Sequence, residues 1–537
     1  MARYDYVIVG AGPAGCVLAN RLSADPGVRV VLLEAGDQDD SPLIAMPGGA
    51  GRLLGDPSRV WYHPTRPFGP SRTVEHWVRG RTLGGSSSVN GMIYNRGGAA
   101  DWDTVERLGN PGWGWRDLLD VYRRMEDNPL GASDVRGTAG PLRVSTASDG
   151  DPLLEDVLRA GAGLGWQRTR DLNETDEERI GHATATIRDG RRVSAATAFL
   201  HPVAERPDLT VRTRTVVDRV LFDGDRAIGV RGRQDGRDVE FEAEREVILA
   251  AGAIATPRIL QLSGVGPADT LRSAGIDVRL DRPNVGARMR EHRVFQLQYR
   301  LAEDIGYNRI LGTEVGRQAA ADEYRRHRTG VLAKPTFDIV GFARTRPDID
   351  RPDAQIQIAP YSIEPREQAS ALEVEREPGM LAIGYGLRPD SEGRVRITAA
   401  DPDAPLDIDA NYFATEHDRC TAVGVVRTLR RLFATAPLAG RIERETVPGP
   451  AVRTDREVLD FGLTVGSAGY HAVGTCAMGP DEEDVTDPAL RVRGLAGLRV
   501  VDASVLPVLV SGNLNGPVSA LAWRAADLVR GDGRDRS

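Results

Sequence analysis

The first 36 residues constrain the fold more than any other stretch, because three glycines there separate two short apolar runs. The runs are residues 5–10 and 28–36, and the residues between them have helical spacing. Gly10, Gly12 and Gly15 form a G-x-G-x-x-G frame, and Glu34 closes the second run, 24 residues after Gly10. Such glycines let the backbone approach a pyrophosphate at a helix N-terminus, and a carboxylate at that distance can bind an adenosine ribose. This order of elements predicts a βαβ unit that binds a dinucleotide, either NAD or FAD, and the carboxylate disfavours NADP.

Three later stretches have the pattern of further strands in the same sheet. They are residues 209–222, 239–254 and 497–507, and an amphipathic stretch follows the last of them. Segments rich in Arg, Asp and Pro separate these strands, so we expect an α/β fold in which the nucleotide-binding domain is discontinuous and carries an inserted second domain. The expected nucleotide-binding region is 1–290, completed by about 486–530, with 100–200 forming part of a lid and substrate lobe; the expected second domain is 291–485.

The composition excludes several classes of protein. The chain of 537 residues has a formal net charge of -8, which disfavours a nucleic-acid partner. No apolar run approaches the ~18 residues of a membrane span, and the N-terminus does not resemble a signal peptide, so we expect a cytoplasmic protein. Cys16, Cys420 and Cys476 are too far apart to suggest a disulfide framework or a metal cluster. Lys334 is the only lysine, and the lack of a G-K-[ST] sequence excludes a Walker-type phosphate loop.

Two further blocks have unusual compositions. Residues 79–97, RGRTLGGSSSVNGMIYNRG, combine small side chains with accessible backbone N–H groups, a combination suited to binding an anion or a ring. Residues 252–266, GAIATPRILQLSGVG, predict a helix that begins near Thr256 and Pro257 and stops at Ser263.

Together these blocks resemble the glucose-methanol-choline (GMC) family of flavin oxidoreductases, whose two signatures match residues 80–103 and 252–266 without gaps. The resemblance spans nearly the whole chain. It implies a Rossmann-like FAD-binding domain with an inserted substrate domain built on an antiparallel sheet. It also implies that FAD is bound noncovalently, because Val89 stands where some relatives bond the flavin through a histidine. The residues that the resemblance places at FAD are Gly10, Gly12, Pro13, Ala14, Gly15, Glu34, Ala35, Leu83, Gly84, Gly85, Asn90, Gly91, Met92, Ile93, Val217, Tyr470, Asp502, Ala503, Asn515 and Pro517.

The segment AGYHAVGTCAMG, residues 468–479, resembles the family's H-x-x-G-T segment, which lays a histidine beside the reactive edge of the flavin. That histidine is His471. Alignment on the following Gly-Pro pair assigns the partner role to Asn513, with Asn515 as the second choice. The resemblance thus implies that an alcohol is oxidised to an aldehyde or ketone by an FAD-dependent oxidase or dehydrogenase. An imidazole would accept the hydroxyl proton, an amide would orient the oxygen, and flavin N5 would take the hydride.

This chain departs from the family pattern at two places. Ala477 stands where the family often has arginine, and the family's V-G-x-x-L-x-D-H pattern appears as residues 285–292, which end in Glu291-His292. We expect neither departure to touch the acid–base pair.

The sequence leaves the substrate and the electron acceptor open. Aromatic, furanic or choline-like primary alcohols are the expected substrates, and molecular oxygen or another acceptor completes the cycle. Asp338 resembles an acidic position that helps some choline-oxidising members hold a trimethylammonium group, although a solvated or salt-bridged acid is the simpler interpretation. A hydroxynitrile lyase with redox-silent FAD is the main alternative; a nicotinamide enzyme or a noncatalytic nucleotide-binding protein is a more distant one.

Overall fold

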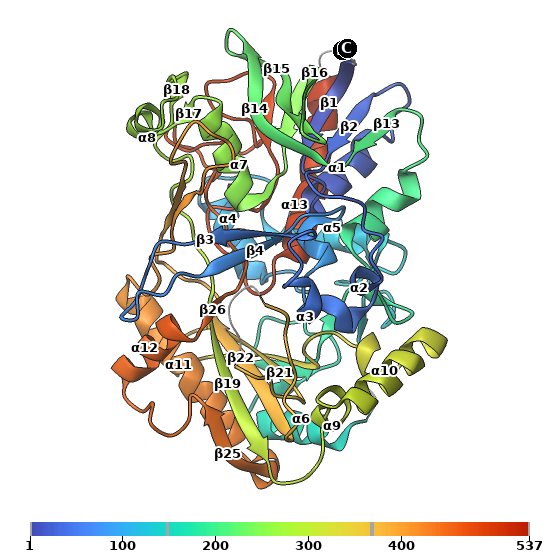
Figure 1. The fold of residues 1–537 in the computed structure, drawn as a ribbon, viewed down its shortest axis with the longest axis vertical. Helices are drawn as coiled ribbons and strands as arrows, with labels where there is room; N and C mark the ends of the chain where they lie inside the picture. Colours follow the sequence, from blue (N-terminus) through green and yellow to red (C-terminus); the bar gives the residue numbers. More distant parts are fainter. Residues whose placement is uncertain (1–2, 147–149, 366–369, 535–537) are drawn as a thin grey trace.

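The computed structural model describes residues 3–146, 150–365 and 370–534, which form two large sheets. Figure 1 shows these sheets towards opposite ends of the longest axis, the first at the top and the second at the bottom. The hairpin of β3 (Val60–Pro64) and β4 (His76–Gly80) lies between them. Within the described ranges, no helix is long and apolar enough to cross a bilayer.

The first sheet has seven strands and a parallel core. Across the sheet the strands are β13 (Leu209–Arg212), β2 (Val30–Leu33), β1 (Arg3–Val9), β16 (Arg237–Leu249), β15 (Arg226–Gln234) and β14 (Thr215–Asp223), and β27 (Leu498–Val500) also pairs with β16. Strand β15 runs antiparallel to its neighbours β14 and β16, and the other strands run in the direction of β1. Strand β2 is buried along its whole length, as expected for a parallel strand covered on both faces. Helices α1 (Pro13–Leu22) and α13 (Asn515–Arg534) pack against each other beside this sheet.

The second sheet has eight strands and is largely antiparallel. Across the sheet they are β25 (Ile442–Val447), β19 (Arg293–Leu301), β22 (Gly379–Gly386), β21 (Ala354–Ala359), β20 (Ile339–Ala343), β9 (Arg179–His182) and β8 (Gln167–Arg168), and β26 (Ser467–Ala468) also pairs with β19. One face packs on α6 (Pro152–Gly163), α11 (Glu416–Phe433) and α12 (Asp455–Thr464). The other face contacts residues of the first half of the chain, including Ile93. Alternate residues of these strands therefore pack against different layers.

The described ranges contain eight further α-helices. They are α2 (Pro42–Ala45), α3 (Ala50–Leu53), α4 (Ala99–Arg107), α5 (Trp115–Met125), α7 (Gly252–Leu262), α8 (Ala268–Ser273), α9 (Asn308–Leu311) and α10 (Glu314–His327).

Helix α7 begins at Gly252, so the predicted start near Thr256 and Pro257 is wrong. Pro257 lies inside the helix, where it has no N–H to donate to the carbonyl of Ala253. The hydroxyl of Thr475 donates to that carbonyl instead, at 2.8 Å. A tertiary contact thus satisfies the group that proline leaves free, and the helix can start one turn earlier than the local sequence suggests. The predicted end holds, because Ser263 is the C-cap residue.

Candidate active site

The glycine-rich turn after β1 is shaped by contacts that only glycine permits. Gly10 has φ +102°, and a Cβ added to Gly15 would lie 1.8 Å from the carbonyl oxygen of Gly10. A Cβ on Gly12, in contrast, would meet no described atom within 4 Å. The N-terminus of α1 therefore opens into free space beside the glycine turn, the shape that a pyrophosphate requires.

Glu34 is tied to the same turn by backbone hydrogen bonds. Its Oε2 accepts from the N–H of Ala11 at 2.9 Å, and its Oε1 accepts from the N–H of Gly36 at 2.8 Å. Burial raises the pKa of this carboxyl to about 7. The N–H of Thr215 bonds the carbonyl of Glu34, which brings β14 and its Val217 to the same edge. These groups fit an adenosine ribose and its base.

The block at residues 83–93 packs directly on this turn. Gly84 and Gly85 have φ of +83° and +53°, and a Cβ on Gly85 would lie 2.7 Å from the Cα of Gly12. The side-chain oxygen of Asn90 accepts from the N–H of Met92 at 3.0 Å. Met92 itself has φ +65°, a conformation that non-glycine residues adopt mainly where function or packing requires it.

Arg192 supports this loop, and the sequence analysis missed it. Its Nη1 donates to the side-chain oxygen of Asn90 at 2.8 Å and to the Asn90 carbonyl at 2.7 Å, and its Nε donates to the Ile44 carbonyl at 2.9 Å. Burial lowers the pKa of Arg192 to about 9. The sequence held no signal for this role, because arginine is abundant throughout the chain.

Asp502 joins the end of β27 to the start of α7. Its Oδ2 accepts from the N–H of Gly252 at 2.8 Å and from the hydroxyl of Thr256 at 2.6 Å. Its Oδ1 accepts from the N–H of Ser504 at 2.8 Å. Asp502 thus ties the C-terminal RVVDAS segment to the second signature block, as Gly85 ties the first block to the glycine turn.

His471 and Asn513 lie side by side, although 42 residues separate them. The Nδ2 of Asn513 is 3.2 Å from the Nε2 of His471. The Oδ1 of Asn513 accepts from the Nε2 amides of Gln355 at 3.0 Å and Gln357 at 3.3 Å, both on β21. These two donors orient the Asn513 amide so that its NH2 group faces the imidazole. Asn515, the second choice, instead begins helix α13.

His292 fixes the tautomer of His471. The Nε2 of His292 lies 2.8 Å from the carbonyl of Leu387, which can only accept, so Nε2 carries the proton. In a neutral ring the Nδ1 of His292 is then an acceptor, and it lies 2.9 Å from the Nδ1 of His471. His471 must donate through Nδ1, so its Nε2 is the acceptor nitrogen, and in this structure it accepts from Nδ2 of Asn513 at 3.2 Å.

Both rings are held neutral by their surroundings. Burial lowers the pKa of His292 to about 4; the hydrogen bond to the Leu387 carbonyl acts in the opposite direction, and the charge of Arg388 lowers the pKa further. Burial lowers the pKa of His471 well below its ordinary value of 6.5, and His292 and Arg79 lower it further.

Glu291 holds the backbone of both histidines. Its Oε1 accepts from the N–H of His471 at 2.6 Å and from the N–H of His292 at 2.9 Å. Burial raises the pKa of Glu291 to about 7, while Arg79, 3.4 Å away, lowers it. The expectation that the Glu291-His292 segment does not touch the pair is therefore wrong. The reason is the sheet register: β19 pairs with β26 through Arg293 and Ala468, which brings the two segments together.

Gly469 leaves room for the histidine pair. A Cβ at this position would lie 2.8 Å from the Cβ of His292 and 3.0 Å from the Nδ1 of His471. The next residue, Tyr470, has φ +62°. The backbone before His471 is thus shaped by the ring contact, and not by local sequence preference.

Asp338 does not join this pair. It lies just before β20, its Oδ1 accepts from the hydroxyl of Tyr307 at 2.9 Å, and Lys334 Nζ is 3.7 Å from that oxygen.

Models of known protein families match most of this chain. The two halves of the GMC oxidoreductase model match residues 4–294 and 389–522. The chain belongs to the GMC oxidoreductase family. The predicted family, the fold class, the FAD cofactor and the assignment as a flavin-dependent oxidoreductase are thereby confirmed.

Similar GMC proteins cover nearly the whole chain. An alcohol dehydrogenase [acceptor] of Pseudomonas putida is 38% identical over 98% of this chain and 95% of its own. The mitochondrial choline dehydrogenase of Homo sapiens is 37% identical over 98% of this chain and 90% of its own. Among solved structures, a pyridoxine 4-oxidase superposes with a TM-score of 0.86 at 30% identity, covering 99% of both chains. A formate oxidase superposes with a TM-score of 0.91 at 26% identity, covering 100% of this chain and 99% of its own.

This GMC enzyme should keep its rate as the pH falls from 8 to 6.5. An ordinary histidine would be half protonated at about pH 6.5, but the lowered pKa of His471 keeps the ring neutral across that range. We therefore expect kcat/KM to change little in this window and to decline only at lower pH, as measured by steady-state rates with a non-titrating alcohol. A decline centred between pH 6.5 and 7.5 that persists in Glu291→Gln, which lacks the neighbouring carboxyl with a pKa of about 7, would contradict the lowered pKa of His471.

Proposed function

We propose that this enzyme oxidises an alcohol to an aldehyde or ketone, with His471 as the base and Asn513 as the group that orients the oxygen. The hydrogen-bonded chain from the Leu387 carbonyl through His292 to His471 supports the proposal most strongly, because it leaves a proton-accepting lone pair on Nε2. The names of the relatives, alcohol dehydrogenase and choline dehydrogenase, support the same reaction.

The two side chains divide the work on the hydroxyl group. The alcohol O–H donates to Nε2 of His471, and the alcohol oxygen accepts from Nδ2 of Asn513. When the proton moves to Nε2, the imidazolium keeps its Nδ1–H bonded to His292, so its new charge is shared along a fixed hydrogen bond. FAD supplies the hydride acceptor when bound. The protein thus contributes position, a neutral base and a dry environment.

The test is anaerobic mixing of the FAD-loaded enzyme with a panel of alcohols. Loss of the oxidised flavin absorbance supports the proposal, whereas product formation with unchanged flavin colour would identify a lyase. Admission of air then reports the acceptor: rapid recolouring indicates an oxidase, and slow recolouring that a quinone or dye accelerates indicates a dehydrogenase.

The noncovalent binding of FAD belongs to the same proposal, because the side chain of Val89 offers no atom for a bond to the flavin. Acid precipitation should therefore release the yellow colour into the supernatant. A cytoplasmic location stays a prediction.

His292 should matter for rate more than for substrate binding. Replacing it by Leu removes the acceptor for Nδ1–H of His471, so the Nε2 lone pair is no longer enforced and kcat should fall by about tenfold or more. His292→Gln retains a side-chain acceptor and should recover part of that loss. Stopped-flow flavin reduction measures both variants. Equal rates for wild type and His292→Leu would show that this contact does not set the tautomer.

A further inference from the structure

We infer that the substrate is an uncharged alcohol with an apolar body, and that Lys334 excludes cationic alcohols by neutralising Asp338. This inference rests on the proposed alcohol oxidation and specifies which alcohols can enter.

The face of the second sheet towards the catalytic pair, the catalytic wall, combines the amides of Gln355 and Gln357 with apolar side chains. Gln355 and Gln357 of β21 point to Asn513, so the residues paired with them on β20, Phe342 and Val340, share that face. Both belong to one buried cluster. Its other members are Ile93, Leu172, Ala183, Val294, Tyr385 and Leu387. The ring of Tyr385 lies 5.8 Å from that of His471, so this apolar cluster reaches the catalytic pair.

Asp338 continues this wall. It precedes Val340 by two residues, so the alternation of an extended chain puts both side chains on the same face, about 6.6 Å apart along the chain. Val340 is the residue that pairs with Gln357. Its side chain is buried, with 4% of the residue exposed. A carboxylate on that face would attract a substituted ammonium group if it kept its charge uncompensated.

The charge of Asp338 is compensated by the only lysine of the chain. Lys334 Nζ lies 3.7 Å from Oδ1 of Asp338 and donates to the hydroxyl of Tyr307 at 2.6 Å. That hydroxyl donates to Asp338 in turn, and the ammonium sits 5.0 Å from the centre of the Tyr307 ring. A second cation would meet a carboxylate that already has its partner, and would lose its hydration without gaining a counter-charge.

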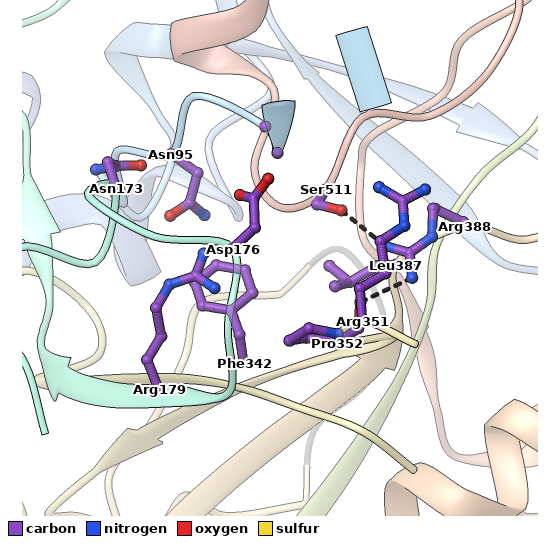
Figure 2. Close-up of a pocket in the computed structure, with 12 residues that line it drawn as sticks. Asn95, Asn173, Asp176, Arg179, Phe342, Arg351, Pro352, Leu387, Arg388 and Ser511 are labelled. Atoms are coloured by element: carbon purple, nitrogen blue, oxygen red, sulfur yellow. Dashed lines mark hydrogen bonds between the residues drawn. The ribbon is translucent and has the colours of Figure 1, made fainter. Parts of the chain in front are cut away.

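A cavity that adjoins the catalytic wall also lacks an excess of negative charge. Figure 2 shows a cavity with Arg179 and Asp176 on one side and Arg351 and Arg388 on the other. Its lining carries three guanidinium groups against one carboxylate. It shares Phe342 and Leu387 with the catalytic wall, and the Leu387 carbonyl accepts from His292. Arg351 and Arg388 are also paired with Asp101, at 2.8 and 3.9 Å, so this cavity offers a cationic substrate no excess of negative charge.

The matched probes are choline and 3,3-dimethyl-1-butanol, which have the same shape and differ in one charge. With FAD-loaded wild-type enzyme under anaerobic conditions, the uncharged alcohol should reduce the flavin more efficiently than choline by about 100-fold or more, because an unpaired buried ammonium is strongly disfavoured. Lys334→Met removes the compensating charge, so this preference should shrink by about tenfold or more. Lys334→Arg should retain it, and Lys334→Met/Asp338→Asn should restore it.

Binding of tetramethylammonium, measured by titration calorimetry, tests the same inference without turnover. Wild type should not bind it, Lys334→Met should, and the double variant should not. Choline as the better wild-type substrate, or tetramethylammonium binding that is equal in all variants, would overturn the inference. If neither alcohol reduces the flavin, the proposed function fails, while the calorimetry still decides the charge selection.

Discussion

Replacing His471 by Ala is expected to reduce alcohol oxidation by about 10²-fold or more, because it removes the group proposed to take the hydroxyl proton. FAD should stay bound, since the described contacts that shape the cofactor loop come from Asn90, Arg192, Asp502 and the glycine turn. The measurements are flavin reduction by stopped flow and flavin content by absorbance of the purified protein.

The matched control is His417→Ala, which removes an exposed histidine of α11. It should retain the wild-type rate. In His471→Ala the defect should lie in kcat and kcat/KM together, because the lost interaction forms only as the proton moves. Near-normal turnover in this variant would remove His471 from the reaction and leave the His292 contact without a catalytic purpose.

Replacing Gly12 by Ala should weaken FAD binding while leaving the apoprotein stable. Gly12 has φ -72°, which any residue can adopt, and its Cβ would meet no described atom within 4 Å. The methyl group would instead occupy the space that the pyrophosphate needs. Overpacking by one methyl costs about 1–3 kcal/mol, equivalent to roughly a tenfold to 100-fold rise in Kd. Quenching of flavin fluorescence during titration of the apoprotein measures that Kd.

Gly440→Ala is the control for Gly12→Ala, because it adds the same methyl group in open space far along the chain, in the short helix at Leu438–Arg441. It should change neither the Kd for FAD nor the melting temperature of the apoprotein. Unchanged FAD affinity in Gly12→Ala would show that the cofactor does not approach this turn. A large loss of apoprotein stability would show that Gly12 is needed for the fold instead.

The elements of the FAD-binding half could be predicted from local sequence. The apolar run before Gly10, the glycine frame and the run that ends at Glu34 became β1, the turn with α1, and β2. Short-range rules suffice here, because hydrophobic periodicity and the need for glycine at the turn act within a few residues. The domain boundaries and the individual contacts to FAD stay predictions.

The start of α7 shows where such rules fail. Proline inside the pattern argues locally for a later helix start, yet Thr475 satisfies the carbonyl that Pro257 leaves free. The two residues are far apart in sequence, so no local window contains the information.

The sequence by itself determined that this chain is an FAD-binding oxidoreductase and singled out His471 and Asn513, because the motifs that carry them are contiguous. Only the tertiary structure decided which atom of His471 is free to accept a proton. That choice depends on hydrogen bonds to His292, 179 residues away, and on the antiparallel register between β19 and β26. The tertiary structure likewise places Lys334 beside Asp338 as an ion-pair partner. The charge state of a buried group depends on the groups that the fold packs around it, and a local stretch of sequence does not contain them.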